Sequence, residues 1–294
     1  MGELAFIGMG SNLGDRAATI GAAIDALDAA EGVAVLRSSM LHETPPVGGP
    51  SGQGPYLNAA LKVETTLPPR DLLGVLQTIE RDSGRVRAAR WSARTLDLDL
   101  LLYGNSAIDE PGLSVPHPRM MVRRFVLAPL AEVSAEPIAP LRGRPICSLL
   151  FDLDRRPGGV VLCGPDPDDS IAARVVEGLD ALDLRYGSAG WNIDHLEGGR
   201  WIVHSRSSLR SMWAIRSDVR LLPNFSATWG PESEESPAAS QMARLGRHGE
   251  IGLGGQLLRI RAPEGGEATR DWIVAEILAA CASSRVPTRV VGSP

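Results

Sequence analysis

The sequence predicts an α+β protein: a ferredoxin-like layer of helices on an antiparallel sheet, followed by a second, smaller α/β domain. In the first half, short apolar runs alternate with amphipathic runs in the order β-α-β-β-α-β. A polar stretch with proline and glycine interrupts this pattern near residues 150–158. A new strand-and-helix pattern follows it. We therefore expect one domain at residues 1–155 and another at residues 159–294.

The elements of the first half follow from local signals. Strands are expected where apolar runs are bounded by glycine or proline, and helices where apolar positions recur at helical spacing. Asp15 is suited to cap the first helix, and Gly84 to close the second. In order, we expect a strand at 3–10, a helix from Asp15 to about Ala30, strands at 33–44 and 56–65, a helix at 68–84, a central strand at 95–104 and a helix at the end of 113–133.

Composition excludes several classes of protein. The net charge of −5 argues against a general nucleic-acid-binding surface, and no apolar stretch is long enough to cross a bilayer. The three cysteines are scattered and form no CxxC pair, so neither a disulfide framework nor a zinc thiolate site is expected. The N-terminus does not resemble a signal peptide. These features predict a cytoplasmic protein without nucleic-acid or membrane partners.

The run TLDLDLLLYG carries the most informative pair of residues. Side chains alternate along a strand, so Asp97 and Asp99 lie on one face while the leucines between them face a core. Two carboxylates on one face repel each other and need a counter-charge, which magnesium ions supply through oxygen ligands. The alternative is a solvated face of an edge strand. The apolar run around the pair favours the metal interpretation.

Basic residues surround this acidic pair in the sequence. His117 lies between two prolines after it, and Arg123 follows a few residues later. Alone, such features indicate an ordinary basic loop and a structural histidine. Beside two carboxylates they favour a site for polyphosphate, because guanidinium groups bind phosphate oxygens and an indole stacks on a flat ring. The residues before the pair are Arg85, Arg87, Arg90, Trp91 and Arg94.

A loop rich in proline and glycine, residues 45–55, separates the second and third expected strands. Tyr56 and Asn58 follow it. The amide of Asn58 offers two donors and an acceptor, which suits the edge of a flat heterocycle. A turn-associated asparagine explains the position equally well.

Together these segments resemble the 6-hydroxymethyl-7,8-dihydropterin pyrophosphokinase family of folate biosynthesis. The resemblance implies a ferredoxin-like fold and a transferase that moves pyrophosphate from ATP to the pterin alcohol and releases AMP. It also implies ATP as co-substrate and two magnesium ions. The matching segments are IGMGSNLGDR (7–16), ETPPVG (43–48), YLNAAL (56–61), GRVRAARWSARTLDLDLLLYG (84–104) and LSVPHPRMMVRRFVLAPLAEV (113–133).

By position, the resemblance implies three groups of site residues. The implied magnesium ligands are Asp97 and Asp99, which with Arg85 and Arg94 are the implied catalytic residues. The residues implied to hold the triphosphate are Arg85, Arg87, Arg94, His117 and Arg123. The residues implied to surround the pterin are Thr44, Pro46, Tyr56, Asn58, Trp91 and Phe125.

Residues 159–294 match no motif that carries chemistry. Gly164 is followed by PDPDDS, which is not the GxxxxGK[ST] of a phosphate loop, and its acidic residues repel phosphate. We expect an α/β domain, either a nucleotide-binding domain that has lost its site or a module that mediates self-association or regulation, ahead of an independent enzyme. A second hypothesis for the whole chain is a binding protein that has lost catalysis. The intact acidic pair, Arg94 and His117 favour the enzyme.

Overall fold

The chain forms two compact units. A computed structural model of the 294-residue chain describes residues 2–47, 51–84, 93–135, 141, 143–154, 159–163, 170–183, 191–196, 200–205, 225–228, 256–259, 267–285 and 287–294. The first unit contains residues 1–150 together with residues 285–294, and the second contains residues 151–284. The expected domains at 1–155 and 159–294 stay a prediction. The structure differs from that expectation in grouping the C-terminal residues with the first unit.

The first unit is built on an antiparallel sheet with helices packed on it, so this part of the fold prediction is confirmed in its coarse form. The strand order is β13-β3-β4-β1-β5, and β2 also pairs with β4. Every pairing in this sheet is antiparallel. The strands are β1 (Glu3–Ser11), β2 (Val33–Ser38), β3 (Leu41–Thr44), β4 (Tyr56–Thr65), β5 (Asp97–Tyr103) and β13 (Arg289–Gly292).

The second expected strand is broken into β2 and β3, which pair with successive parts of β4. Ser38 pairs with Leu61, and His42 pairs with Asn58. The chain therefore advances four residues along β2 and β3 while it advances three along β4. This mismatch is a β-bulge. Ser39 bridges it, because its hydroxyl accepts a hydrogen bond from the Ala60 amide at 2.9 Å.

Strand β5 lies at the end of the sheet, so its expected central position is wrong. Among the described strands it pairs only with β1. Its outer edge is nevertheless covered, because the His117 amide donates to the Leu101 carbonyl at 2.9 Å. From helix α2 (Pro69–Asp82), Glu80 accepts a hydrogen bond from the Leu98 amide at 2.8 Å. An apolar strand can therefore lie at an edge when other segments bury it.

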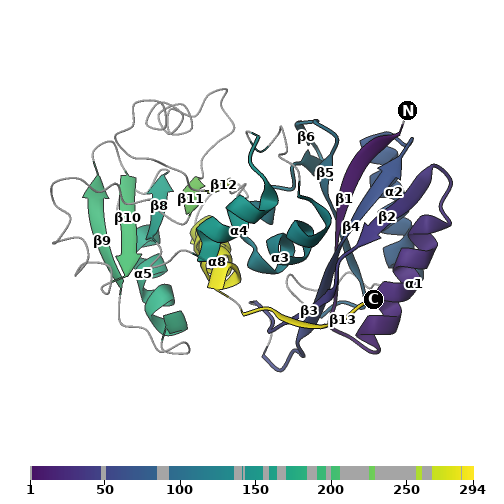
Figure 1. The fold of residues 1–294 in the computed structure, drawn as a ribbon. Coiled ribbons are helices and arrows are strands. Elements are labelled where there is room, and N and C mark those ends of the chain that lie inside the picture. The colour runs from purple at the N-terminus through teal and green to yellow at the C-terminus, as the bar shows by residue number, and fades with distance from the viewer. Residues whose placement is uncertain are drawn as a thin grey trace. The chain divides into compact units, whose positions relative to one another are not determined.

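Helices cover both faces of the sheet (Figure 1). Helix α1 (Arg16–Asp28) and α2 lie on one face, and α3 (Arg124–Val133) lies on the other. The Asp15 side chain caps α1 by accepting from the Ala18 amide at 3.1 Å, as expected. Gly84 follows α2 with a φ of 78°, a backbone conformation that favours glycine.

The main core fills the space between the sheet and the α1–α2 layer. Side chains at alternate positions of β1 and β5 enter it, which leaves the intervening positions on the face covered by α3. The site therefore belongs to the α3 face. Core members include Ile7, Met9, Ile20, Leu72, Leu76, Leu98 and Leu100.

A hairpin and a short turn lead from β5 to α3. The hairpin strands are β6 (Ile108–Glu110) and β7 (Leu113–Val115), and a 3-10 turn, η1 (Met120–Val122), follows. His117 and Arg123 lie on the segment between β7 and α3. This segment starts beside β5 and ends on the opposite face from α1, so it carries both residues toward the acidic pair.

The second unit has its own sheet of mixed direction. The strand order is β12-β11-β8-β10-β9, in which β11 runs parallel to β8 and β12 while β10 is antiparallel to β8 and β9. Its described strands are β8 (Gly159–Cys163), β9 (Trp191–Leu196), β10 (Arg200–Ser205), β11 (Phe225–Thr228) and β12 (Gln256–Arg259). Its helices include α5 (Ser170–Asp183) and α8 (Glu267–Arg285), and α4 (Ile146–Asp154) crosses the boundary between the units.

Arg174 of α5 and Asp271 of α8 form an ion pair within the second unit. Buried apolar side chains on both helices, such as Val175 and Ile277, give this unit a core of its own. In the part of the chain that the structure describes, no helix is both long and apolar enough to cross a membrane.

Candidate active site

The strand register places Asp97 and Asn58, which were expected at the phosphate and pterin sides of the site, in one row across the sheet. Gly10 of β1 pairs with Asp97 of β5 on one side and with Asn58 of β4 on the other. Asn58 in turn pairs with His42 of β3. Residues that pair directly have their side chains on the same face. The acidic pair and the amide therefore face the same space and are separated by a single glycine position.

Gly10 keeps that space open. A Cβ at this position would lie 3.5 Å from the Asn58 Oδ1 atom and 4.0 Å from the Asp97 Cβ atom. Both are ordinary contact distances, so the glycine is not required by a steric clash. It instead leaves the surface between Asp97 and Asn58 free for a ligand.

The acidic end begins with an ion pair. Arg94 Nη1 lies 2.7 Å from Asp97 Oδ1, and both side chains are partly exposed. Burial works to lower the pKa of Arg94, but the charge and hydrogen bond of Asp97 outweigh it and raise this pKa overall. Arg94 therefore stays charged next to the carboxylate.

Asp99 has two hydrogen-bond donors nearby, neither of them close enough to bond to it. Its Oδ2 atom lies 3.9 Å from His117 Nε2 and 4.0 Å from Arg123 Nη1. These distances exceed hydrogen-bonding range. The three side chains thus bring one negative group and two donors close together without pairing them directly.

His117 is neutral, with its proton on Nε2. Its Nδ1 atom accepts a hydrogen bond from the Arg119 amide at 3.2 Å, which leaves the proton on the nitrogen that faces Asp99. Burial, followed by the charges of Arg123 and Arg119, lowers the pKa of His117 to about 3, against the opposing effect of Asp97. A neutral Nε2–H group can donate to a carboxylate or phosphate oxygen at any physiological pH.

Arg123 and Phe125 lie together where α3 begins. The guanidinium carbon of Arg123 is 5.6 Å from the centroid of the Phe125 ring, which is within cation–π range. Burial lowers the pKa of Arg123, and the charges of Asp99 and Asp97 oppose this shift. The N-terminus of α3 thus brings a cation and an aromatic ring to the site on one turn.

At the amide end, the nitrogen of Asn58 has both of its hydrogen-bond partners within the protein. Asn58 Nδ2 donates to Thr44 Oγ1 at 2.8 Å and to the His42 carbonyl at 3.4 Å, and Asn58 and Thr44 are both buried. A carbonyl oxygen can only accept, so these contacts fix the nitrogen toward β3. The Oδ1 atom is therefore left on the side of Gly10, where it can accept a hydrogen bond from a ligand.

Tyr56 lies between the two ends. Burial raises the pKa of its hydroxyl, Arg94 opposes this shift and Asp97 adds to it. The hydroxyl is therefore protonated at neutral pH and can donate a hydrogen bond. Pro46, just beyond β3, is half-exposed. Arg85, Arg87 and Trp91 lie outside the described residues, as does Arg90.

One residue of the site was given no role from sequence. The Asn12 side chain accepts a hydrogen bond on Oδ1 from the backbone amide of Arg94 at 2.7 Å. The backbone amide of Asn12 donates to the Arg94 carbonyl at 3.1 Å. Its Nδ2 atom donates to Gln53 Oε1 at 3.3 Å. Asn12 therefore holds the segment that carries Arg94. Its position directly after an apolar strand, within GSNLGDR, was the available signal.

The donor set fits magnesium held together with a polyphosphate. Among the described residues, no group of three or more His, Cys, Asp or Glu side chains could hold a metal alone. Asp97 and Asp99 supply two hard oxygen ligands from one strand face. Magnesium is commonly bound by one or two carboxylates, with substrate phosphates and water completing the octahedron.

Comparisons with known proteins agree on one family. The family model described as 7,8-dihydro-6-hydroxymethylpterin-pyrophosphokinase matches residues 6–135. The chain is 45% identical over 133 residues to the 2-amino-4-hydroxy-6-hydroxymethyldihydropteridine pyrophosphokinase of Bacillus subtilis, which covers 45% of this chain and 79% of that protein. The protein of the same name from Haemophilus influenzae is 42% identical over 136 residues. This match covers 46% of this chain and 84% of that protein.

One similar solved structure is titled wild-type Plasmodium falciparum HPPK-DHPS. The match covers 87% of this chain and 64% of that chain. This chain therefore spans less than two thirds of that one. The TM-score is 0.40 at 12% sequence identity, which is too low to support an inference.

Proposed function

Because this chain belongs to the 7,8-dihydro-6-hydroxymethylpterin-pyrophosphokinase family, we propose that it transfers pyrophosphate from ATP to 6-hydroxymethyl-7,8-dihydropterin and releases AMP, as a step of folate biosynthesis. One observation carries the proposal: Asp97, Gly10 and Asn58 form a continuous row on one face of the sheet. In the proposal, charged phosphates bind at the Asp97 end of this row and a flat heterocycle binds at the Asn58 end.

In the proposed reaction, the pterin hydroxyl oxygen forms a bond to the β-phosphorus of ATP. The bond from that phosphorus to the oxygen bridging the α- and β-phosphates breaks, and AMP leaves with that oxygen. The hydroxyl proton passes to solvent. The protein forms no covalent bond, so its contribution is to position the two substrates and to balance the charge of the triphosphate.

The proposed charge balance combines side chains of both signs. Arg94, His117 and Arg123, with Arg85 and Arg87, hold the triphosphate. The neutral His117 donates from Nε2, and the arginines provide positive charge. Two magnesium ions held by Asp97 and Asp99 would supply additional positive charge on the phosphate oxygens when bound.

The proposed pterin site uses the amide end of the row. Asn58 Oδ1 accepts a hydrogen bond from the edge of the heterocycle, because its nitrogen is already committed to β3. Phe125 and Trp91 offer aromatic faces to the ring. Thr44, Pro46 and Tyr56 complete the surroundings of the ring. The hydroxymethyl group then points along the row toward Asp97.

Three further assignments are part of the same proposal. The α1–α2 layer on the antiparallel sheet is a ferredoxin-like arrangement. The second unit is a separate α/β domain that mediates self-association, and the protein is cytoplasmic. The first assignment is supported by the element order of the first unit, and the second by the separate core of residues 151–284.

A product assay tests the proposed function. The purified chain is incubated with ATP, magnesium and 6-hydroxymethyl-7,8-dihydropterin, and AMP is separated from ADP. We expect AMP formation that depends on the pterin. Formation of ADP would indicate a simple kinase, and binding of both substrates without any nucleotide product would favour the binding-protein hypothesis.

A further inference from the structure

The C-terminal segment is part of the sheet that carries the site. After the second unit, the chain returns to the first unit, and β13 pairs antiparallel with β3 (Figure 1). In the register, Arg289 is opposite Glu43 and Val290 is opposite His42. Strand β3 pairs with β4 on its other side. Without β13, β3 would be a short edge strand with its outer backbone groups unpaired.

Strand β3 sets the orientation of the Asn58 amide. Both hydrogens of Asn58 Nδ2 are directed at β3, one to the Thr44 hydroxyl and one to the His42 carbonyl. The position of Oδ1 over Gly10 therefore depends on the position of β3. A shift of β3 would lengthen these hydrogen bonds and move the Oδ1 atom relative to the site.

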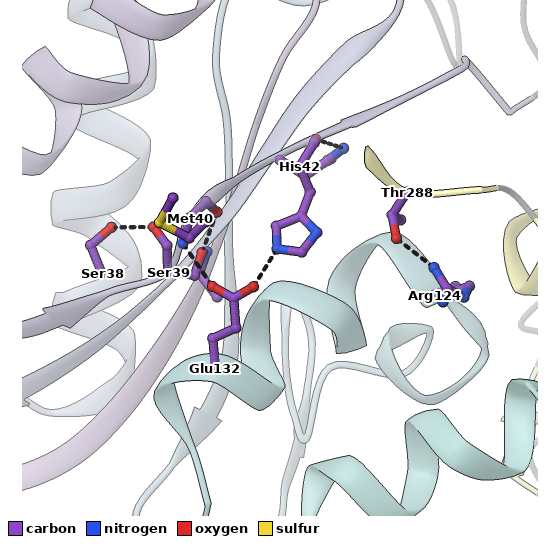
Figure 2. A network of polar contacts seen from close by, with 9 residues as sticks. Ser38, Ser39, Met40, His42, Arg124, Glu132 and Thr288 are labelled. Atoms are coloured by element: carbon purple, nitrogen blue, oxygen red, sulfur yellow. Dashed lines mark hydrogen bonds and ion pairs between the residues drawn. The ribbon is translucent and has the colours of Figure 1, made fainter. Parts of the chain in front are cut away.

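The same C-terminal segment also contacts the start of α3. Arg124 Nη1 donates a hydrogen bond to Thr288 Oγ1, one residue before β13 (Figure 2). Arg124 lies between Arg123 and Phe125, the two site residues on this helix turn. One segment thus contacts both β3, which carries Thr44, and the start of α3, which carries Phe125.

A second contact ties β3 to α3 directly. From the far end of α3, Glu132 accepts hydrogen bonds from the Met40 amide at 2.8 Å and from His42 Nε2 at 2.7 Å (Figure 2). Strand β3 is therefore held by β4, by α3 and by β13. Of these three supports, only β13 lies outside the stretch that the family model matches.

We propose that residues 287–292 act as a positioning strand for the pterin side of the site. By pairing with β3 and holding Arg124, they keep Thr44, Asn58 and Phe125 in the arrangement that receives the heterocycle. The inference rests on the proposed function, because it assigns the pterin to this end. The proposal gives the C-terminal segment, and Thr288 in particular, a role in substrate affinity. These residues need not touch the substrate to have this role.

Two pairs of variants test the proposal, one of C-terminal truncations and one of substitutions at Thr288. A chain ending at Arg285 loses the strand, and a chain lacking only Ser293 and Pro294 is its matched control. Thr288→Val removes the hydroxyl while keeping the shape of the side chain, and Thr288→Ser retains the hydroxyl. The readouts are KM for 6-hydroxymethyl-7,8-dihydropterin, KM for ATP, kcat, and amide hydrogen exchange of residues 41–44.

We expect Thr288→Val to raise the pterin KM about five- to tenfold, as for the loss of one hydrogen bond that fixes a site, with a change in ATP KM below about twofold. The chain ending at Arg285 should show a larger rise and faster exchange at residues 41–44. Both controls should behave as the wild type.

Equal changes in both KM values, or a lowered melting temperature with an unchanged pterin KM, would overturn the proposal and leave β13 a structural strand. Unchanged hydrogen exchange in the chain ending at Arg285 would show that β13 does not support β3. A wild-type chain that forms no AMP would contradict the proposed function instead, and the exchange measurement would still test the strand.

Discussion

The two ends of the site differ in how their polar groups are satisfied. At the amide end, Asn58 Nδ2 lies 2.8 Å from Thr44 Oγ1, and both residues are buried. At the acidic end, Asp99 Oδ2 lies 3.9 Å from His117 Nε2 and 4.0 Å from Arg123 Nη1, and the Asp99 side chain is 36% exposed. At the first end the amide nitrogen is paired within the protein, whereas at the second Asp99 lies beyond hydrogen-bonding distance of both His117 and Arg123.

The difference follows from the cost of burying each kind of group. A neutral amide and hydroxyl can satisfy each other and be buried at little cost. Two carboxylates on one strand face cannot, because they repel each other and lose hydration. In the proposed reaction, the acidic end therefore keeps solvent access until phosphates and metal ions bind. We expect substitutions at the acidic end to act mainly on turnover, and those at the amide end on pterin affinity.

The largest expected effect is at the acidic end. Asp97→Asn and Asp99→Asn should each lower kcat by about a hundredfold to a thousandfold, the range found when a group that stabilises transition-state charge is removed. The pterin KM should change little. Steady-state kinetics with AMP detection measure both parameters.

Stability is the control for these two variants. Asp97 and Arg94 are both partly exposed, so loss of their ion pair should change the free energy of unfolding by no more than about 1 kcal/mol. A variant that keeps near-normal turnover would show that its carboxylate is not a metal ligand.

The amide end should give the opposite pattern. Asn58→Ala removes the acceptor beside Gly10 and should raise the pterin KM by about tenfold to a hundredfold, because a polar edge of the ring then loses its partner. Thr44→Val keeps the shape of Thr44 but releases one hydrogen of the amide, so its effect should be smaller. A fall in kcat without a change in pterin KM would break the proposed division between the ends.

Gly10→Ala tests the space between the two ends. The added methyl meets only ordinary contacts, so the protein should fold, but it would occupy the surface over which the substrates approach. We expect kcat/KM for the pterin to fall by about tenfold, since small displacements of reacting groups are costly.

Gly74→Ala is the matched control, because Gly74 is exposed in α2 with no atom within 4 Å of the added Cβ. It should leave activity unchanged and stabilise the protein by up to about 1 kcal/mol. Equal activity of the two variants would show that the surface over Gly10 is not used.

The smallest expected effect concerns stability in acid. The pKa of His117 is about 3 in the folded protein, below the value of about 6.5 expected for the unfolded chain. The unfolded state therefore binds a proton that the folded state excludes, and stability falls as the pH drops from about 6.5 toward 3. His117→Gln should lose less stability than the wild type between pH 7 and pH 4 in urea unfolding. Parallel losses of stability in the two proteins would contradict a neutral, partly buried His117.

Much of the first unit was predictable because its signals are local. Alternation in TLDLDLLLYG predicted the shared face of Asp97 and Asp99, and Asp15 predicted the start of α1. The position of β5 in the sheet was not predictable in this way. Its apolar run suggested a central strand, but Glu80 and the segment at His117 bury an edge strand instead.

Contacts between distant segments were the features that local signals missed. The bulge between β2 and β3 depends on the register with β4, and nothing in residues 33–44 marks a break. Strand β13 is only four residues long. This is too short for the alternation of apolar and polar residues to identify the strand or its partner. Asn12 acts through the backbone of Arg94, which lies 82 residues away in the sequence.

A crystal structure with substrates tests most directly the claim that the two ends meet over Gly10. The complex would contain magnesium, the pterin and an ATP analogue whose α–β bridging oxygen is replaced by a methylene group, since that is the bond the reaction breaks. We predict the ring edge at Asn58 Oδ1, the hydroxymethyl oxygen over Gly10 facing the β-phosphorus, and two metal ions on Asp97 and Asp99. A pterin bound away from Gly10, or metal ions held without these two carboxylates, would contradict the account.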